Sequence, residues 1–433
     1  MKVFSPLELA KFARRKSPIY REFYASLPDD GELRWEEIPI LDQDKFWAAN
    51  TFAGSRVLTG PSVDGVVFKS GGTTGSPKFS VFSQDEWNAF CATFGRGLTA
   101  GGLRRGDRVA NMFYAGELYA SFIFILKSLE LAGEPGLQFP LGGSMPAHNV
   151  LKTCGELGID VWAGVPTSLM SLVEEYAANR KLYGELRPRK ILFGGEGMYG
   201  DQRARVEAVF PGVRLQSIGY ASVDAGPLGY ADEGCAPGEH RVFGKETLFE
   251  IVDEDTGELI EEVGRPGRAI FTNLIRGLVP IIRYPAGDIA QWVEPKGANP
   301  DRKFLLLGRA GEAARVGPVS LYYEDARKIL ESVFVGEPAA AGFVFQIVVS
   351  HFERKDEMKF VIAVGTAGAG ASIDTAALSA KIRDRIHAER PGLLSEAEAG
   401  HTHPVQVEFA PLSRLEKNSR TGKLKRVIDR RSS

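Results

Sequence analysis

The strongest constraint on the fold lies between residues 108 and 218, where short β-prone runs alternate with helical patterns. Strands are predicted at 108–113, 161–165, 190–193 and 213–218, and helices at 117–131, 167–178 and 201–210, with Thr167 as a helix cap. A strand that returns parallel to its neighbour needs a long crossover, which is usually a helix. The alternation therefore predicts a largely parallel sheet that is covered by helices on both faces.

Other patterns precede and follow this region. Residues 1–50 are predicted to be mostly helical, because apolar residues recur there at helical spacing. Residues 240–307 read as strand after strand, separated by turn signals such as Asp255-Thr256-Gly257, so we expect an antiparallel region. After Gly308 the predicted elements are a helix near 321–334, strands near 343–349 and 359–364, a helix near 373–389 and a strand near 405–409.

The expected fold class is therefore α/β, with two domains. Residues 1–308 would form a large N-terminal domain, in which parallel sheets covered by helices adjoin an antiparallel β region. Residues 309–433 would form a small, mobile α+β C-terminal domain. A chain of 433 residues, with 44% hydrophobic and 25% charged positions, is long enough for this organisation.

Charge and cysteine content narrow the possible partners. Lysine and arginine total 53 and the acidic residues 55, which gives a net charge of -2. The protein therefore has no overall positive charge that would attract nucleic acid or an acidic membrane. Cys91, Cys154 and Cys235 lack C-x-x-C spacing, which argues against a disulfide framework or a zinc cluster and fits a reducing cytoplasm. The longest apolar run, 118–126, is too short to span a bilayer. We expect small molecules or single proteins as partners.

Residues 70–78 read SGGTTGSPK, which is typical of a loop that wraps phosphate oxygens. Glycine lets backbone N–H groups converge on an anion, the threonines and serines add hydroxyl donors, and Lys78 adds positive charge. The β-prone residues 66–68 would deliver this loop from a strand. It is not a Walker loop, because Phe79 stands where that motif has serine or threonine after its lysine. The loop predicts ATP binding, and a solvated hairpin turn is the alternative.

Further motifs follow along the chain in a definite order. Together with SGGTTGSPK they are Ser17-Pro18-Ile19-Tyr20-Arg21, Gly194-Gly195-Glu196, Gly219-Tyr220, Arg283-Tyr284 with Gly287-Asp288, Gly308-Arg309, and Ser419-Arg420-Thr421-Gly422-Lys423-Leu424-Lys425-Arg426. In this order, over nearly the whole chain, they resemble the adenylate-forming superfamily and look most like its phenylacetate-CoA ligase branch. Members of that family join a carboxylic acid to AMP with release of pyrophosphate, and most then pass the acyl group to a thiol.

The resemblance implies ATP and Mg²⁺ as cofactors, with coenzyme A or phosphopantetheine as the thiol. It also implies roles for the matching residues. The β- and γ-phosphates would be held by Thr73, Thr74, Gly75 and Lys78, and the adenine by Gly194, Gly195, Glu196 and Tyr220, with Ala221 and Ser222 beside it.

Four charged residues complete the implied site. Asp288 would bind the ribose hydroxyls with help from Arg309, and Asp224 would bind Mg²⁺. Lys423 would be the adenylating lysine, carried on the mobile tail domain. Two alternatives stay open: Asp288 could be a turn cap after Gly287, and the basic run around Lys423 could be a solvated face.

This chain departs from the family's motifs. The family's Y-G-x-T-E reads YASVD here, so Val223 cannot donate the hydrogen bond that a threonine gives to the α-phosphate, a loss of about 1–3 kcal/mol. Asp224 keeps a carboxylate for Mg²⁺ on a shorter side chain, and Ser222 could donate in place of the threonine.

Two glycines also replace family residues. Gly71 stands where the phosphate loop usually has a serine, and Gly311 stands where the domain hinge usually has an aspartate. Weakened adenylation or an altered second step is the expected consequence.

The acid is argued from aromatic residues. Phe113, Tyr114, Phe139 and Tyr199 lie near motifs that border the acyl pocket in relatives, and an aromatic lining would suit an aryl acid. Ordinary core aromatics are an equal alternative. The short chain with altered motifs also resembles adenylating enzymes that tailor aromatic antibiotics such as phenazines.

Three functions follow from these features. The leading one is ATP-dependent activation of an aromatic carboxylic acid as the acyl-adenylate, followed by transfer to coenzyme A or a carrier-protein thiol. In the second, the adenylate passes to a reductase or an amine. The third is a catalytically weakened nucleotide- or ligand-binding protein, which Gly71, Val223 and Gly311 would explain. A homodimer is expected because relatives often pair.

Overall fold

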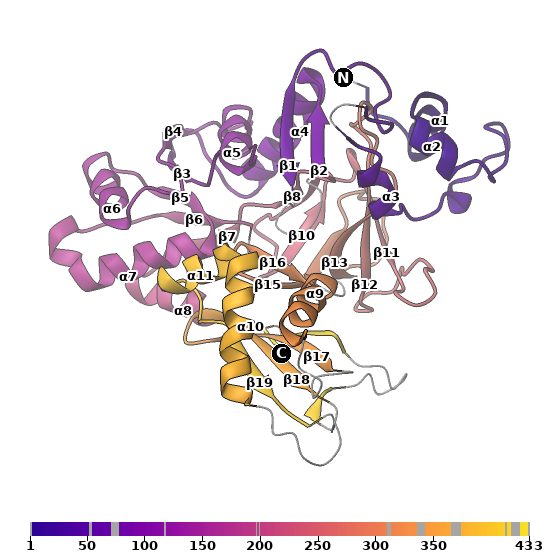
Figure 1. The fold of residues 1–433 in the computed structure, drawn as a ribbon. Coiled ribbons are helices and arrows are strands. Elements are labelled where there is room, and N and C mark those ends of the chain that lie inside the picture. Colours follow the sequence, from indigo (N-terminus) through magenta and orange to yellow (C-terminus); the bar gives the residue numbers. More distant parts are fainter. Residues whose placement is uncertain are drawn as a thin grey trace. The chain divides into compact units, whose positions relative to one another are not determined.

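The computed structural model describes most of the chain, in two compact units. The described residues are 2–51, 54–70, 78–116, 118–195, 197–198, 200–309, 313–335, 343–364, 374–411, 414–416 and 425–431, without the side chains of 167, 201, 309 and 324. Described residues up to Leu307 form the first unit and those from Gly308 form the second (Figure 1).

The first unit contains the elements α1 (Pro6–Lys16), α2 (Pro18–Phe23), the 3-10 helix η1 (Trp35–Glu37), α3 (Gln43–Ala48), β1 (Val66–Ser70), β2 (Lys78–Phe82), α4 (Gln84–Ala100), β3 (Arg108–Met112), α5 (Ser121–Glu130), β4 (Leu137–Pro140), α6 (Ala147–Glu156), β5 (Val161–Gly164), α7 (Pro166–Tyr183), β6 (Lys190–Phe193), α8 (Gly200–Val209), β7 (Arg214–Ser217), β8 (Tyr220–Ser222), β9 (Gly226–Tyr230), β10 (Glu239–Val242), β11 (Thr247–Val252), β12 (Gly267–Asn273), β13 (Tyr284–Trp292) and β14 (Lys303–Arg309), which ends at the division. The second unit contains β15 (Ala313–Val316), β16 (Val319–Tyr322), α9 (Tyr323–Phe334), β17 (Val344–Phe352), β18 (Lys355–Ala363), α10 (Thr375–Glu389), α11 (Pro391–Glu398), β19 (Gln406–Phe409) and β20 (Val427–Asp429).

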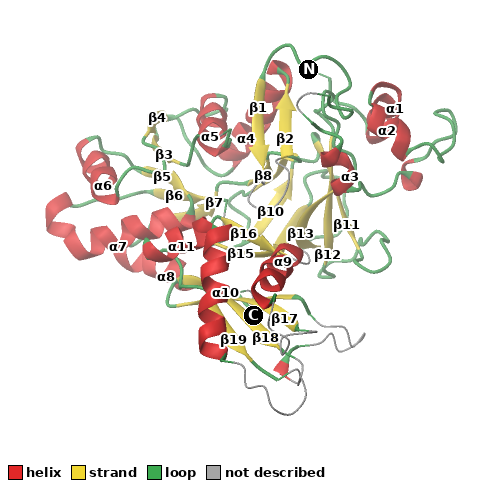
Figure 2. Cartoon of the chain, viewed as in Figure 1, coloured by secondary structure: helices red, strands yellow, loops and turns green. Residues whose placement is uncertain are grey.

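A parallel sheet in the order β4-β3-β5-β6-β7 organises the middle of the first unit. Alternate residues of its central strands point to opposite faces. Val161 and Leu192 pack in the cluster that contains α4 and α5, whereas Trp162 and Ile191 pack in the cluster that contains α6, α7 and α8 (Figure 2). The prediction of a parallel sheet with helices on both faces is confirmed.

Two helix starts in this region differ from the predictions. α5 begins at Ser121 because Gly116 and Tyr119 form a β-bridge before it. α7 begins at Pro166 with Val165 as the N-cap residue, so Thr167 is not the cap. The N–H groups of the first helical turn have no partner within the helix. Proline, which has no N–H, therefore suits this position, and the helix starts there.

A second sheet of the first unit is antiparallel, as predicted for residues 240–307. Its strand order is β11-β12-β13-β14-β10-β9-β8. The rings of Phe249 and Phe271 stack in its core at a centroid distance of 4.6 Å. Tyr20 and Phe46 from the predicted N-terminal helices pack in the same core, and the Tyr20 hydroxyl donates to the Pro280 carbonyl at 2.8 Å.

The second unit has its own core and is an α+β unit. Its four-stranded sheet has the order β19-β18-β17-β20, and β15 pairs with β16 beside it. Residues of α9 and α10 such as Leu330 and Ile382 are fully buried with Ile347 of β17.

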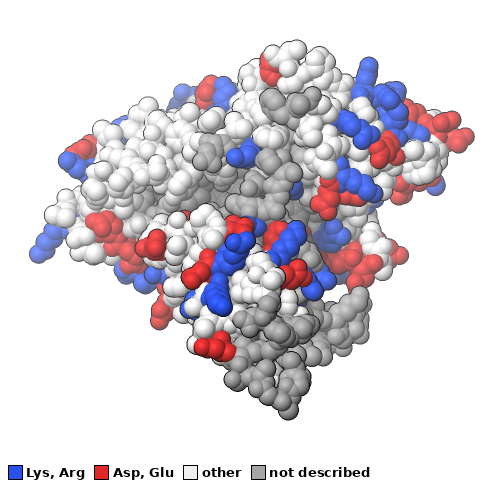
Figure 3. All heavy atoms as spheres, viewed as in Figure 1, with Lys and Arg blue, Asp and Glu red and all other residues white. Residues whose placement is uncertain are grey.

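Two further properties concern the described chain as a whole. In its described part, no helix is both long and apolar enough to cross a membrane. Basic and acidic side chains are interspersed over the face drawn in Figure 3.

Candidate functional site

The phosphate-type loop is framed by a β-hairpin. β1 and β2 pair antiparallel, and the last pair before residues 71–77 is Ser70 with Lys78. The prediction that a strand leads into the loop is confirmed. The Lys78 ammonium donates to the Gln43 side chain at 3.2 Å and lies 5.7 Å from the ring centroid of Trp47. Its positive charge therefore stands at the base of the loop.

A buried carboxylate fixes this hairpin to the rest of the site. Asp224 is 7% exposed, and its Oδ1 accepts hydrogen bonds from the hydroxyls of Ser70 at 2.6 Å and Ser80 at 3.0 Å. Its Oδ2 accepts from the Tyr284 hydroxyl at 3.4 Å. A buried charge has to be paired or hydrogen-bonded, so one carboxylate connects β1, β2, the turn after β8 and the start of β13.

A buried arginine binds the backbone at the same junction. Arg276 is 1% exposed, and its guanidinium donates to the backbone carbonyls of Asp224 and Val81 and lies over the Phe82 ring at 4.1 Å. Burial lowers the pKa of Arg276 to about 10, so the side chain remains charged at neutral pH. Because Arg276 follows β12 and lies in none of the motifs, the sequence offers no signal for it.

Tyr220 and Asp288, the residues predicted at the adenine and at the ribose, contact each other. The Tyr220 hydroxyl donates to Oδ2 of Asp288, and the Tyr220 ring packs near Phe271 and Phe304 at centroid distances of 5.8 and 6.1 Å. Asp288 lies within β13, in an irregular stretch where the pairing with β12 shifts register and Gly287 has φ +83°. A bulge of this kind re-aims a side chain, and the Asp288 carboxylate contacts Tyr220 of β8.

The residues Gly194 and Gly195 follow β6 directly. The Gly194 N–H donates to the Gly164 carbonyl at 3.2 Å, and a Cβ on Gly194 would lie 2.5 Å from Cγ2 of Ile218. A side chain cannot be accommodated at that distance, so this position requires glycine. Gly195 has φ +81°, which also favours glycine. Gly194 is buried and Gly195 is exposed, so Gly195 leaves a side-chain-free glycine surface at the carboxyl end of a parallel strand, where ligands bind in sheets of this kind.

The altered YASVD motif has a structural explanation. Val223 packs against the apolar cluster of α4 and α5, so it contributes burial and no hydrogen bond. The Ser222 hydroxyl oxygen accepts from the backbone N–H groups of Asp224 at 3.2 Å and Ala225 at 3.3 Å. Its proton can still be donated. Ala221 is half-buried opposite Pro227 in β9.

A buried histidine that no motif indicated supports the tyrosine. His240 is 5% exposed; its Nε2 lies 2.8 Å from the Ser217 hydroxyl and its ring 6.0 Å from the Tyr220 ring. Burial lowers the pKa of His240 to about 4, so the imidazole is neutral at physiological pH. The Gly219 N–H also donates to Ser217, at 3.2 Å. Ser217 and His240 thus hold the residues that lead into Tyr220.

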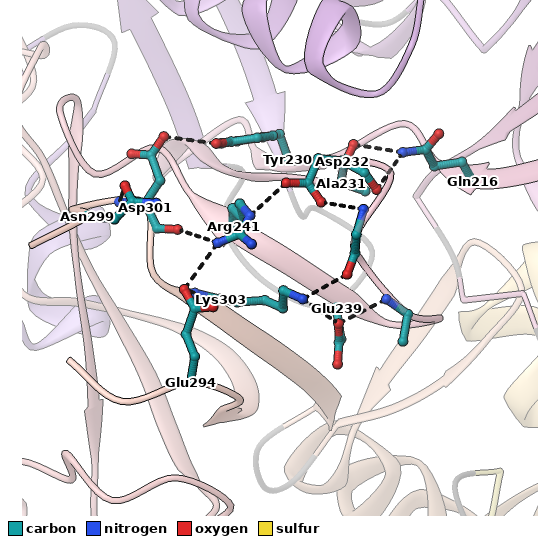
Figure 4. Close-up of polar contacts among 12 residues, drawn as sticks. Gln216, Tyr230, Ala231, Asp232, Glu239, Arg241, Glu294, Asn299, Asp301 and Lys303 are labelled. Carbon is teal, nitrogen blue, oxygen red and sulfur yellow. Dashed lines mark hydrogen bonds and ion pairs between the residues drawn. The ribbon is translucent and has the colours of Figure 1, made fainter. Parts of the chain in front are cut away.

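The other face of β10 is fixed by ion pairs. Figure 4 shows Arg241 between Asp232 and Glu294, with nitrogen–oxygen distances of 2.7 and 3.1 Å. Lys303 of the neighbouring strand donates to the Gly234 carbonyl at 2.8 Å. Because successive strand residues point to opposite faces, these contacts hold β10 while His240 points toward Tyr220.

Several of the predicted site residues lie outside the described ranges, and the predicted acyl-pocket aromatics lie in different environments. Thr73, Thr74, Gly75, Glu196 and Lys423 lie outside the described residues, as do Gly71, Tyr199, Gly311 and the side chain of Arg309, whose backbone ends β14. Among the predicted acyl-pocket aromatics, Phe113 is 3% exposed in the core, Phe139 is half-buried under the Arg108 guanidinium, and Tyr114 is exposed with its hydroxyl 2.9 Å from that of Ser168.

Asp224 could supply one carboxylate to a Mg²⁺ site but not a complete set of ligands. In the described part of the chain, no group of three or more His, Cys, Asp or Glu side chains is arranged to hold a metal ion. The carboxylate already accepts three hydroxyls, which leaves acceptor capacity mainly on Oδ2. Mg²⁺ is commonly held by one or two carboxylates together with substrate phosphates, and Asp224 fits that pattern.

Comparison with known proteins finds similar sequences over much of this chain. A sequence model described as "AMP-binding enzyme" matches residues 66–271. A phenylacetate-coenzyme A ligase of Thermus thermophilus is 26% identical over 374 residues, which cover 84% of this chain and 80% of that protein. One from Pseudomonas putida is 25% identical over 58% of this chain and 56% of its own length.

Solved structures show the same fold. A 2-hydroxyisobutyryl-CoA ligase, in complex with 2-HIB-AMP and CoA in the thioesterification state, superposes with a TM-score of 0.71 over 98% of this chain and 88% of that chain, at 18% identity. The same ligase in its postadenylation state gives 0.62. The amide bond synthetase McbA from Marinactinospora thermotolerans gives 0.54 over 86% of this chain and 69% of that one, at 17% identity.

Removal of the Asp224 carboxylate should loosen the site. In Asp224→Ala the Ser70, Ser80 and Tyr284 hydroxyls lose their acceptor, and we expect the free energy of unfolding to fall by about 2–3 kcal/mol. Asp224→Asn keeps an acceptor oxygen for the two serines and should lose about 1 kcal/mol or less. Urea denaturation of both variants checks this. Equal stabilities of the alanine variant and the wild type would contradict the role of Asp224.

The buried His240 predicts a loss of stability in mild acid. Its pKa is about 4 in the folded protein and near 6.5 when exposed, so the unfolded chain binds the proton first as the pH falls. His240 therefore contributes stability above pH 6.5 that is lost progressively toward pH 4. Between pH 7 and 5 the wild type should lose about 2 kcal/mol more than His240→Asn. Denaturation curves with parallel pH dependence in both proteins would show that His240 is not the cause.

Proposed function

We propose that the chain, which is similar to an AMP-binding enzyme model and to phenylacetate-coenzyme A ligases, activates an aromatic carboxylic acid as the acyl-adenylate. Its relatives support an acid-activating ligase of the adenylate-forming kind. The observation that carries the proposal is the junction of Tyr220 with Asp288 beside the glycine surface after β6. It supplies an aromatic ring from β8, which follows the carboxyl end of the parallel strand β7, and a carboxylate from β13.

The proposed reaction brings two anions together. A carboxylate oxygen of the acid forms a bond to the α-phosphorus of ATP, and the bond from that phosphorus to the β-phosphate bridge breaks, which releases pyrophosphate. Catalysis is then mostly positioning and neutralisation of charge. Lys78 and the donors of the loop that follows β1 would hold the β- and γ-phosphates. Mg²⁺, where bound by Asp224 and the phosphates, would neutralise part of their charge.

The nucleoside would be held by the described residues. Tyr220 and the backbone at Gly194 and Gly195 would enclose adenine, with Ala221 and Ser222 beside it. The two ribose hydroxyls would donate to the Asp288 carboxylate, which can accept from both. Lys423, in the proposed C-terminal domain 309–433, would reach the α-phosphate, and Arg309 would assist at the ribose. The division of the described residues at Leu307 supports this domain assignment.

The second step is proposed as transfer of the acyl group to a thiol. Three curated relatives are named phenylacetate-coenzyme A ligases, which supports coenzyme A as the acceptor and an aryl acid as the substrate. A carrier-protein thiol, a reductase and an amine are the other acceptors. All three cysteines are free thiols, which supports action in the reducing cytoplasm. A homodimer and a place in aromatic antibiotic biosynthesis belong to the same proposal.

A second candidate function is nucleotide binding with weak catalysis. The packing of Val223 in an apolar cluster favours it, because a hydrogen-bond donor toward the α-phosphate is missing at this position. In that case ATP would bind while acid activation is slow.

Acid-dependent pyrophosphate exchange separates the two candidates. With ATP, Mg²⁺ and labelled pyrophosphate, we expect exchange with phenylacetate, benzoate or related aryl acids, at rates at least tenfold above those with aliphatic acids. Lys423→Ala should lower the exchange rate by a hundredfold or more, because it removes the charge proposed to act at the α-phosphate. ATP binding measured by calorimetry, without exchange for any acid, would overturn acid activation and leave the binding function.

A further inference from the structure

The residues on either side of Lys423 are joined to each other. Glu416 and Lys425 are the nearest described residues before and after it, and the Lys425 N–H donates to the Glu416 carbonyl at 3.0 Å. The Glu416 carboxylate accepts from the Lys425 ammonium at 3.3 Å and from the Arg430 guanidinium at 2.6 Å. These two positions therefore have a defined separation, although they are nine residues apart in sequence.

One buried side chain binds both of these positions. Gln346 of β17 is 2% exposed. Its Nε2 donates to the Glu416 carbonyl at 2.7 Å and to the Lys425 carbonyl at 2.6 Å, and its Oε1 accepts from the Glu416 N–H at 2.9 Å. The amide uses both of its donor hydrogens and its oxygen on the backbone that flanks Lys423.

The backbone continues this attachment after Lys425. The Ile347 N–H donates to the Arg426 carbonyl at 2.9 Å, and β20 then runs parallel to β17 with Ile347 opposite Val427. β17 is the central element of this attachment because it supplies the Gln346 side chain and the neighbouring backbone bond. A sheet strand is a rigid support for residues that act in catalysis.

We propose that Gln346 is a positioning residue for acid activation: it fixes Glu416 and Lys425, the described residues that flank Lys423, and thereby restricts the backbone that carries the proposed catalytic ammonium. This inference rests on the proposed role of Lys423. A lysine side chain is long and flexible, so the place of its charge depends on the backbone that carries it. A displacement of about 1 Å in a catalytic group can cost about a hundredfold in rate.

The test replaces the amide while keeping its shape. Gln346→Met has a similar volume and no hydrogen bonds, and it should lower kcat for pyrophosphate exchange by about ten- to a hundredfold. The KM for ATP should stay within about twofold, because none of the hydrogen bonds described for the Gln346 side chain goes to Tyr220, Asp288 or Lys78, which are proposed to hold ATP. Val349→Ala is the matched control: it truncates a side chain of the same strand that is 1% exposed and makes no hydrogen bond to Glu416 or Lys425. It should keep kcat within about threefold of the wild type.

The outcomes separate this inference from the proposed function. If Val349→Ala lowers kcat as much as Gln346→Met at a similar loss of melting temperature, Gln346 has a merely structural role and the inference is overturned. An unchanged kcat in Gln346→Met, with Lys423→Ala inactive, would also overturn it and leave the proposed function intact. Normal exchange in Lys423→Ala would overturn both the lysine assignment and the inference built on it.

Discussion

The candidate site depends on one buried carboxylate. Asp224 accepts the hydroxyls of Ser70, Ser80 and Tyr284, while the fully buried Arg276 binds its backbone carbonyl. A charge that is removed from water is stable only with such partners, so these contacts constrain one another. They join the hairpin that carries the phosphate-type loop to β8, which carries Tyr220, and to β13, which carries Asp288. The residues proposed to bind the nucleotide come from separate stretches of sequence, and this junction brings several of them together.

The same junction explains why the chain can depart from the family motif. At the last position of YASVD, the shorter aspartate reaches the serine hydroxyls of β1 and β2 within a nearly water-free site. Val223 adds apolar burial and Ser222 caps the turn through two backbone N–H groups. The substitutions therefore form a consistent local structure. Hydrogen bonding at this motif is directed to the protein itself, which is the physical basis for the slower adenylation expected in the proposed reaction.

Sequence patterns predicted the elements that depend on short-range spacing of residues and on local motifs. The parallel sheet follows from buried runs such as Val161 to Gly164, and the family motifs placed Tyr220 and Asp288, which the structure brings into contact. The family resemblance itself is confirmed by the AMP-binding match and by the phenylacetate-CoA ligase relatives. Thr167 failed as a helix cap because Pro166 already starts that helix.

Long-range polar contacts could not be predicted in this way. Arg276 and Asp224 are 52 residues apart, and Gln346 and Glu416 are 70 apart, so neither pair leaves a local pattern. His240 looks like an ordinary strand residue until its packing against Tyr220 is known. Such contacts depend on tertiary packing, which periodicity and composition do not encode.

A crystal structure with a non-hydrolysable analogue of the acyl-adenylate tests the central claim most directly. The account predicts that the adenine lies against Tyr220 and the glycine surface after β6, that the ribose hydroxyls donate to Asp288, and that Asp224 keeps the hydroxyls of Ser70 and Ser80. An analogue bound elsewhere, with Asp288 making no ribose contact, would contradict it.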